Sequence, residues 1–245
     1  MNICLFTEDE INQPIPAGDD RAKHIIKVLH KKMGDSFEGG IIGKKAGICC
    51  ITNISDNGDI SFTFEEKSDG KPLYPLTLII GFPRPIQLRR LLRDVAGLGV
   101  AKIILTGTEL GEKSYMESND IKDGGALRML LDGTVQAAST HVPELVLVKK
   151  LDEAVELAFT ASENARGVAL DNRRASKSLH AWLEVENPCC TVAAIGSERG
   201  WTENERDFLE SRGFSLCSMG TRVLRTETAA TVAASIILDS MGYLS

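Results

Sequence analysis

Two glycine-containing segments near the C-terminus carry the residues best suited to chemistry. The first, AAIGSERG at residues 193–200, is an apolar run that ends in a polar turn. The second, SLCSMGTRVLRTETAATVAASIIL at residues 215–238, places arginines, a glutamate and threonines between apolar stretches. Ligands of open α/β sheets bind just outside the carboxyl ends of the strands. The two segments therefore predict one binding pocket, lined by main-chain groups of two or three loops.

The elements expected to hold these turns in place are apolar runs that alternate with amphipathic segments. Runs typical of buried strands lie at residues 76–82, 101–108, 144–150, 166–171, 191–196 and 214–217. Segments that favour helices lie between and after them, at residues 85–100, 124–139, 151–161, 202–212 and 226–241. Uniformly apolar strands alternating with helices indicate an α/β fold with a parallel sheet covered on both faces. The pattern alone predicts an ordinary doubly wound sheet.

The first 70 residues have a different rhythm. Short alternating segments flank Asn57-Gly58, which is a hairpin signal. Apolar residues at helical spacing predict one short helix within residues 20–32. The polar segment 67–75 turns through glycine and two prolines and ends this part. Residues 1–70 are therefore predicted to form a small, mainly β domain with a helix.

The formal charge of −6 argues against indiscriminate nucleic-acid binding, but one window of the chain is basic. Residues 21–45 hold seven lysines and arginines against two acidic residues. A basic patch on an acidic protein fits docking on one chosen polyanion. The alternative is an ordinary solvated helix face.

The remaining composition is that of an ordinary globular protein. No run approaches the 18 apolar residues of a membrane span, and no basic region followed by an apolar stretch marks a secretory signal. The six cysteines form no CxxC pair and have no histidine at metal-ligand spacing, so a zinc site has little support. We expect a reduced, cytoplasmic protein without a metal.

The familiar nucleotide and hydrolase motifs do not occur. IGSERG lacks the GxGxxG spacing of a dinucleotide-binding turn, and GxxxxGK[ST] and GxSxG are missing. The four histidines do not support a two-histidine metal site.

The two C-terminal segments resemble the paired signature of the RsmE-type 16S rRNA uridine-N3 methyltransferases, which belong to the SPOUT class. The first turn departs from the usual form, with Ser197 in place of proline and Arg199 in place of glycine. Further departures are His30, Gly97, Ser139 and Arg84. The second segment matches almost throughout, at Gly220, Arg222, Leu224, Arg225, Thr226, Glu227, Thr228 and Ala229. Weaker matches extend the resemblance over essentially the whole chain, at His24, Val28, Leu29, Gly34, Asp35, Leu98, Gly99, Val100, Gln136, Val142 and Pro143.

The resemblance implies a PUA-like RNA-binding β-barrel domain at residues 1–70 and a SPOUT methyltransferase domain with a deep trefoil knot at residues 71–245. It also implies S-adenosylmethionine as the cofactor, 16S ribosomal RNA or the small ribosomal subunit as the partner, and a homodimer. No membrane is implied. The residues expected to bind RNA are Arg21, Lys23, His24, Lys27, Lys31 and Arg84.

The methyl transfer that the resemblance implies requires particular chemistry, and this requirement suggests candidate site residues. Arg225, Glu227 and Glu198 are candidates for catalysis, as a base that removes the uridine N3 proton or a cation that stabilises the uridine anion. Alternatively, Glu227 interacts with the dipole of the last helix, with Thr226 as its N-cap, and Arg222 forms a structural ion pair. The residues expected to bind the cofactor are Leu170, Gly196, Ser197, Glu198, Gly200, Leu216, Met219, Gly220, Leu224, Thr226 and Thr228.

The leading hypothesis is therefore an enzyme that methylates N3 of a specific uridine in 16S ribosomal RNA. The alternative is a non-catalytic RNA-binding or ribosome-assembly protein that retains the fold, which the Arg199 departure motivates. A third hypothesis, an unrelated nucleotide-binding α/β enzyme, lacks the phosphate-loop motifs.

Overall fold

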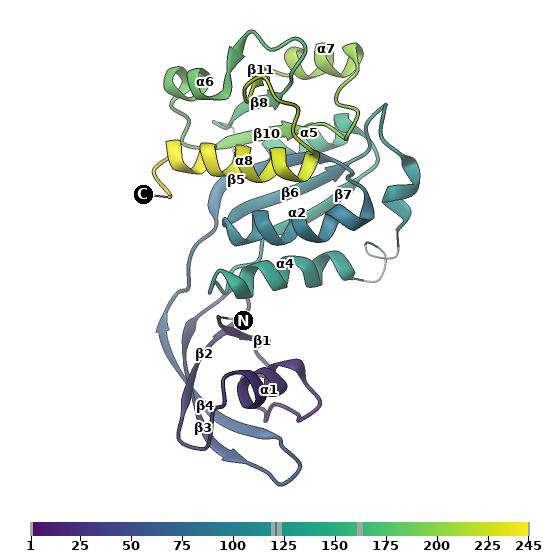
Figure 1. The fold of residues 1–245 in the computed structure, drawn as a ribbon. Coiled ribbons are helices and arrows are strands. Elements are labelled where there is room, and N and C mark those ends of the chain that lie inside the picture. Colours follow the sequence, from purple (N-terminus) through teal and green to yellow (C-terminus); the bar gives the residue numbers. More distant parts are fainter. Residues whose placement is uncertain (1, 119–120, 122–123, 161–163, 245) are drawn as a thin grey trace. The chain divides into compact units, whose positions relative to one another are not determined.

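The computed structural model describes residues 2–118, 121, 124–160 and 164–244. The chain divides into two compact units, one of Met1–Pro72 with Asp132–Val142 and one of Leu73–Leu131 with Pro143–Ser245. Each unit has its own sheet (Figure 1). None of the helices in these described ranges is long and apolar enough to cross a membrane.

The first unit contains a four-stranded sheet in the order β1-β2-β3-β4. Gly58, with φ of 89°, lies in the turn between the antiparallel strands β3 and β4, which confirms the predicted hairpin. The predicted helix is also confirmed, although its second half is a π-helical turn. A closed PUA-like barrel remains a prediction. The elements are β1 (Cys4–Phe6), α1 (Asp20–Lys23), the turn η1 (His24–Val28), β2 (Ser36–Ile41), β3 (Ala46–Ile54) and β4 (Ile60–Ser68).

The second unit contains a seven-stranded sheet in the order β7-β6-β5-β10-β8-β11-β9, and every pair of neighbouring strands is parallel. The predicted parallel α/β sheet is thus confirmed. The strands are β5 (Tyr74–Gly81), β6 (Val100–Thr106), β7 (Glu144–Val148), β8 (Arg166–Leu170), β9 (Lys177–Ser178), β10 (Thr191–Ile195) and β11 (Ser215–Ser218).

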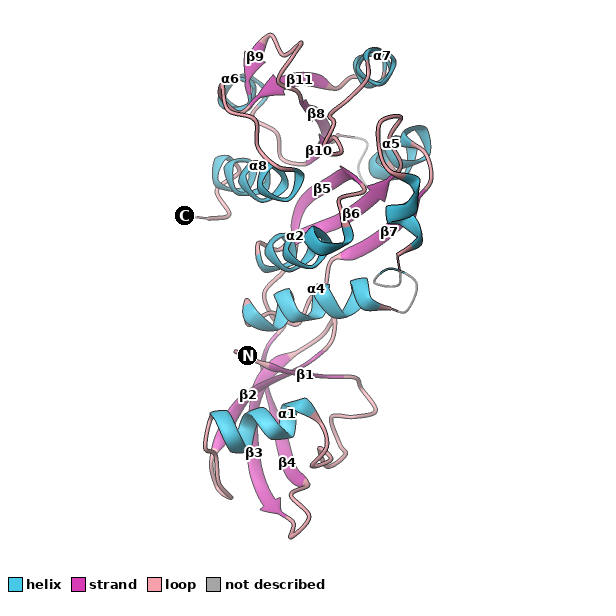
Figure 2. Ribbon diagram, turned by 45° about the vertical axis from the view of Figure 1, so that its right-hand side comes forward, coloured by secondary structure: helices cyan, strands magenta, loops and turns pink. Residues whose placement is uncertain are grey.

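Helices cover both faces of this sheet (Figure 2). The strands carry apolar side chains on both sides, and the helices bury them. Helices α2 and α8 pack against each other on one face, and α5 lies on the other. The core between the sheet and helices α5 and α7 includes Ile79, Ile104 and Phe214. The helices of this unit are α2 (Pro85–Gly97), a 3-10 turn (Lys113–Glu117), α5 (Leu151–Phe159), α6 (Leu179–Glu186), α7 (Glu203–Ser211) and α8 (Thr226–Ser240). Helix α4 (Gly125–Gln136) begins in the second unit and ends in the first.

Candidate active site

Three neighbouring strands of the seven-stranded sheet end side by side. Strand β8 lies between β10 and β11, and Leu170 at its end is in register with Ile195 on one side and Cys217 on the other. Because all three strands are parallel, the loops that follow them leave the sheet at the same edge. These loops are residues 171–176, 196–202 and 219–225.

The three loops enclose a cavity of about 560 Å³, within the range usual for small-molecule sites. The N-terminal turn of α8 closes it with Thr226 and Ala229. The strand-end residues Leu170, Ile195 and Cys217 form an apolar part of its lining. The remaining lining residues are Asp171, Asn172, Arg173, Gly196, Ser197, Glu198, Arg199, Gly200, Trp201, Arg206, Met219, Gly220, Arg222, Val223 and Leu224.

The turn after β10 is tightly packed and needs glycine at two positions. The Gly200 amide donates to the Ser197 carbonyl over 2.8 Å, and Gly200 adopts φ of 73°. A Cβ on Gly196 would lie 3.1 Å from the Gly200 backbone. Arg199 has no positive φ, so the turn accepts its side chain without backbone strain. Ser197 is buried, and its Oγ accepts from the Thr108 hydroxyl over 3.1 Å.

The loop after β8 is held by a buried ion pair that we did not predict from the sequence. Asp171 and Arg206 lie 2.7 Å apart (Oδ2 to Nε), and each side chain is only 2% exposed. The other carboxylate oxygen, Oδ1, accepts from the amides of Arg173 over 2.8 Å and of Arg174 over 2.5 Å. Burial alone would raise the pKa of Asp171, but the hydrogen bonds from Arg174, Arg206 and Arg173 lower it below its usual value.

Helix α7 supplies Arg206 and is itself well fixed. Its N-cap Thr202 accepts from the Glu205 amide, and Glu205 accepts in return from the Thr202 amide over 2.9 Å, which completes a capping box. The neighbouring Trp201 donates its indole N–H to the Leu170 carbonyl over 3.0 Å. The loops after β8 and β10 are thus joined on the α7 side of the cavity.

The loop after β11 runs directly into α8. Gly220 adopts φ of 91°, which a residue with a Cβ would resist. The Thr226 hydroxyl donates to the Gly196 carbonyl over 3.3 Å and so connects this loop to the turn after β10. The alternative that Thr226 is the N-cap of α8 is wrong, because Arg225 occupies that position and makes no side-chain capping bond.

The structure brings most of the predicted cofactor-binding residues into this cavity. All of them line it except Leu216 and Thr228. Leu216 points to the opposite side of the sheet, because side chains alternate along a strand, and it packs in the core with α5 and α7. Thr228 is exposed on α8.

Of the three catalytic candidates, only Glu198 lines the cavity. Its Oε1 accepts from the Arg84 amide over 2.9 Å at the start of α2, and the Arg84 guanidinium lies 3.9 Å away. Arg225 and Glu227 flank the cavity residue Thr226. The Arg225 side chain is exposed and has no partner among the described residues, whereas Glu227 is buried in the first turn of α8.

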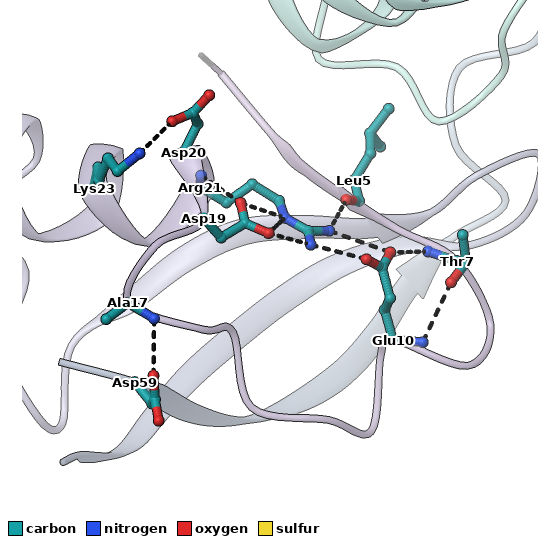
Figure 3. Close-up of polar contacts among 9 residues, drawn as sticks. All are labelled: Leu5, Thr7, Glu10, Ala17, Asp19, Asp20, Arg21, Lys23 and Asp59. Carbon is teal, nitrogen blue, oxygen red and sulfur yellow. Dashed lines mark hydrogen bonds and ion pairs between the residues drawn. The ribbon is translucent and has the colours of Figure 1, made fainter. Parts of the chain in front are cut away.

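The basic window of the first unit is partly used for internal contacts (Figure 3). Arg21 bonds to Glu10 over 2.9 Å, Asp19 over 2.7 Å and the Leu5 carbonyl over 2.8 Å. The side-chain hydrogen bonds from Arg21 lower the pKa of Glu10 and Asp19 below their usual values. Arg21 therefore has a structural role that we did not predict from the sequence.

The other predicted RNA-binding residues of this unit make fewer internal hydrogen bonds and ion pairs than Arg21. Lys23 forms an exposed i,i+3 pair with Asp20. Lys27 and Lys31 have no ion-pair partner within the described ranges. The Nε2 atom of His24 is buried without a hydrogen-bond partner in that same part of the chain.

The family model described as RNA methyltransferase domain matches residues 69–238, which include all three strand-end loops. The chain belongs to the ribosomal RNA small subunit methyltransferase E family. It is 35% identical over 240 residues to ribosomal RNA small subunit methyltransferase E 1 of Borreliella burgdorferi, covering 98% of each chain. It is 35% identical over 243 residues to the Treponema pallidum enzyme, covering 97% of this chain and 91% of that one.

Solved structures show the same fold. The ribosomal RNA small subunit methyltransferase E from Neisseria gonorrhoeae, bound to S-adenosyl methionine, has a TM-score of 0.77 and 21% sequence identity. The match covers 98% of this chain and 97% of that chain. The fold is the SPOUT-class α/β fold.

Proposed function

We propose that this protein transfers the methyl group of S-adenosylmethionine to N3 of a uridine in 16S ribosomal RNA. The observation that carries the proposal is the cavity at the ends of β8, β10 and β11, which lies within the matched methyltransferase region. The relatives named as methyltransferases of small-subunit ribosomal RNA, and the S-adenosylmethionine in the Neisseria structure, support the substrate and the cofactor.

The residues present suit S-adenosylmethionine. Its adenosine and methionine parts need apolar walls and close main-chain groups, and the cavity offers Leu170, Ile195 and Leu224 as walls. Gly196 and Gly200 let the turn beside the cavity pack closely, since a Cβ on Gly196 would meet the Gly200 backbone and Gly200 adopts φ of 73°. We assign the lining members of the predicted set to cofactor binding: Leu170, Gly196, Ser197, Glu198, Gly200, Met219, Gly220, Leu224 and Thr226.

The bound cofactor supplies an electrophilic methyl group, and the protein must help the uridine N3 proton to leave. We assign Arg225 to stabilise the uridine anion, because its exposed guanidinium is uncommitted within the described ranges and lies at the N-terminus of α8. Glu198 is the carboxylate that lines the cavity and is our candidate base. Glu227 is buried and does not line the cavity, so we favour a supporting role for it in the first turn of α8.

We propose that the first unit docks on RNA through Lys23, Lys27 and Lys31, and that it corresponds to a PUA-like barrel. His24, whose Nε2 atom is buried, is not assigned to this surface. We further propose that the protein acts in the cytoplasm as a homodimer and that its second unit has a trefoil knot. The non-catalytic alternative was motivated by Arg199. It loses that support because the turn after β10 accepts an arginine there without strain.

The test uses purified protein, tritiated S-adenosylmethionine and small ribosomal subunits from a strain that lacks the gene. We expect transfer of tritium to one uridine, located by mass mapping of the RNA. Arg225→Ala should lower the rate of transfer roughly 10²-fold or more with the calorimetric affinity for the cofactor retained. Arg166→Ala, at the opposite end of β8, is the matched control and should transfer normally.

Absence of cofactor binding by the wild-type protein would favour the non-catalytic alternative. Transfer to another nucleotide would keep the enzyme class and overturn the uridine N3 assignment. Unchanged transfer by Arg225→Ala would overturn the role of that residue alone.

A further inference from the structure

Each of the three loops around the cavity contributes one exposed arginine to its lining. Arg173 follows β8, Arg199 follows β10 and Arg222 follows β11. We propose that these three residues, the arginine rim, bind phosphate groups of the RNA on either side of the target uridine. This inference rests on the proposed function, since it concerns how the RNA substrate is held at the same cavity.

The rim arginines are available for a ligand. The guanidinium groups of Arg173 and Arg222 have no hydrogen bond or ion pair to the described residues, so the structural ion-pair alternative for Arg222 is not supported. Arg199 pairs with Glu112 over 3.3 Å, but the two side chains are 66% and 51% exposed. Such an exposed pair contributes little to stability and exchanges readily for another anion.

Arg206 provides the contrast. It also lines the cavity, but its side chain is only 2% exposed and is committed to Asp171 and Glu203. The described lining of the cavity therefore contains one buried arginine that supports the wall and three exposed arginines whose charge is unpaired or weakly paired. Only the three exposed arginines are suited to an external anion.

The backbone that carries the rim is fixed before a ligand arrives. The Arg173 amide is bonded to Asp171, whose carboxylate is locked by the buried pair with Arg206. Arg199 lies inside the turn that the Gly200 amide closes on the Ser197 carbonyl over 2.8 Å. Fixed backbone positions lower the entropy lost when a ligand binds.

The number of the arginines, and their origin in three separate loops, favour RNA over the cofactor as their ligand. A single carboxylate, such as that of S-adenosylmethionine, is satisfied by one guanidinium in a bidentate pair. Three guanidinium groups from three separate loops exceed that need, whereas a nucleic-acid backbone presents one phosphate per nucleotide. On a chain with a net charge of −6, a local cluster of positive charge at the cavity mouth selects a polyanion there.

The test compares the wild-type protein, Arg173→Gln/Arg222→Gln, Arg199→Gln and the control Arg166→Gln. Arg166 is an exposed arginine at the other end of β8, paired with Glu186. The probe is an unmodified 16S ribosomal RNA transcript, and its affinity is measured at several salt concentrations between about 50 and 200 mM. Calorimetry gives the affinity for S-adenosylmethionine, and tryptophan fluorescence checks folding.

Each phosphate contact to single-stranded nucleic acid contributes about 0.7 to the slope of log affinity against log salt. We expect the double variant to lose about 1.4 from this slope and to bind RNA roughly tenfold more weakly, with cofactor affinity retained. Arg199→Gln should lose about 0.7 or less, because its wild-type side chain first leaves Glu112. Arg166→Gln should match the wild type.

An unchanged slope in the double variant, with normal methyl transfer by the wild type, would overturn the proposal that the arginine rim binds RNA phosphates. The proposed function would remain intact. A loss of cofactor affinity as large as the loss of RNA affinity would assign the arginines to the cofactor and also overturn the rim. Failure of the wild type to transfer methyl groups would instead count against the proposed function, and the salt slopes would still decide the rim.

Discussion

The buried pair between Asp171 and Arg206 is the contact on which the cavity wall most depends. Asp171→Asn keeps the size of the side chain and removes its charge. In the wild type, the Asp171 carboxylate accepts from Arg206 on one oxygen and from two backbone amides on the other. The asparagine side chain has only one oxygen. In either orientation its NH₂ group therefore faces a donor, which is either Arg206 or the two backbone amides. At least one buried hydrogen bond is lost, and the charge of Arg206 is left without its closest counter-ion.

The burial of both side chains sets the size of the effect. Removing one partner of a buried ion pair typically costs about 3–5 kcal/mol. Arg206 keeps Glu203 at 2.9 Å, but that carboxylate is 68% exposed and screened by water. We therefore expect a loss of about 3 kcal/mol in the free energy of unfolding. For a domain of this size, that loss lowers the melting temperature by about 6–12 °C.

Tryptophan fluorescence is well placed to measure this change. The only two tryptophans, Trp182 and Trp201, are buried in the second unit, so urea unfolding followed by fluorescence reports on that unit. The matched control is Asp207→Asn, the same substitution at an exposed partner of Arg174. Its unfolding midpoint should stay close to that of the wild type.

A double-mutant cycle with Arg206→Met isolates the pair. If the two charges stabilise each other, the loss in free energy of unfolding of the double variant should be smaller than the sum of the two single losses. We expect the difference to be about 2 kcal/mol. Equal losses in Asp171→Asn and Asp207→Asn, or a coupling near zero, would show that the buried pair does not stabilise the cavity wall. The result would then assign Asp171 to ordinary loop structure.

The pH dependence gives an independent check. Because the folded pKa of Asp171 lies below its ordinary value, its contribution is fully present above the unfolded pKa of about 3.9. That contribution is lost as the pH falls through the folded pKa. The stability difference between the wild type and Asp171→Asn should therefore be constant from about pH 6 to 8 and shrink below about pH 4. A difference that grows on acidification would contradict the lowered pKa.

Two further predictions concern the two ligands separately. Lys23→Glu/Lys27→Glu should weaken binding of 16S ribosomal RNA in a salt-dependent way with cofactor affinity retained, and an equal loss of both would indicate misfolding. Gly196→Ala should weaken calorimetric binding of S-adenosylmethionine roughly tenfold or more, because its Cβ would lie 3.1 Å from the Gly200 backbone. Gly18→Ala, whose Cβ would meet nothing within 4 Å, is the control, and cofactor affinity equal in the two variants would contradict the close-packed turn.

Local patterns in the sequence were sufficient to predict the sheet and much of the cavity. Apolar runs located β5, β6, β7, β8, β10 and β11, and the glycine-containing turns located the loops after β10 and β11. Helix α6 was missed, although Ser178 followed by Leu179, Trp182 and Leu183 is a capping residue before apolar residues at helical spacing.

The loop after β8 could not be found in the same way. Its importance follows from the position of β8 between β10 and β11, and strand order is not encoded in local periodicity. Asp171 and Arg206 are 35 residues apart, and nothing in their immediate neighbours marks either residue as buried. The same limit explains Arg21, whose role depends on Glu10 and the Leu5 carbonyl from a preceding segment.

Burial divides the arginines around the cavity into two groups with different consequences. Arg206 is buried and paired, so it stabilises the wall and adds no charge that an external anion would experience. The rim arginines are exposed, so their attraction for phosphate is real but screened, and it weakens as salt rises. A chain with a net charge of −6 repels RNA as a whole, and a small group of exposed arginines at the cavity then favours binding there. If this reasoning is correct, adding salt should weaken RNA binding more steeply in the wild type than in the rim variant, while Asp171→Asn should lower stability at any salt concentration.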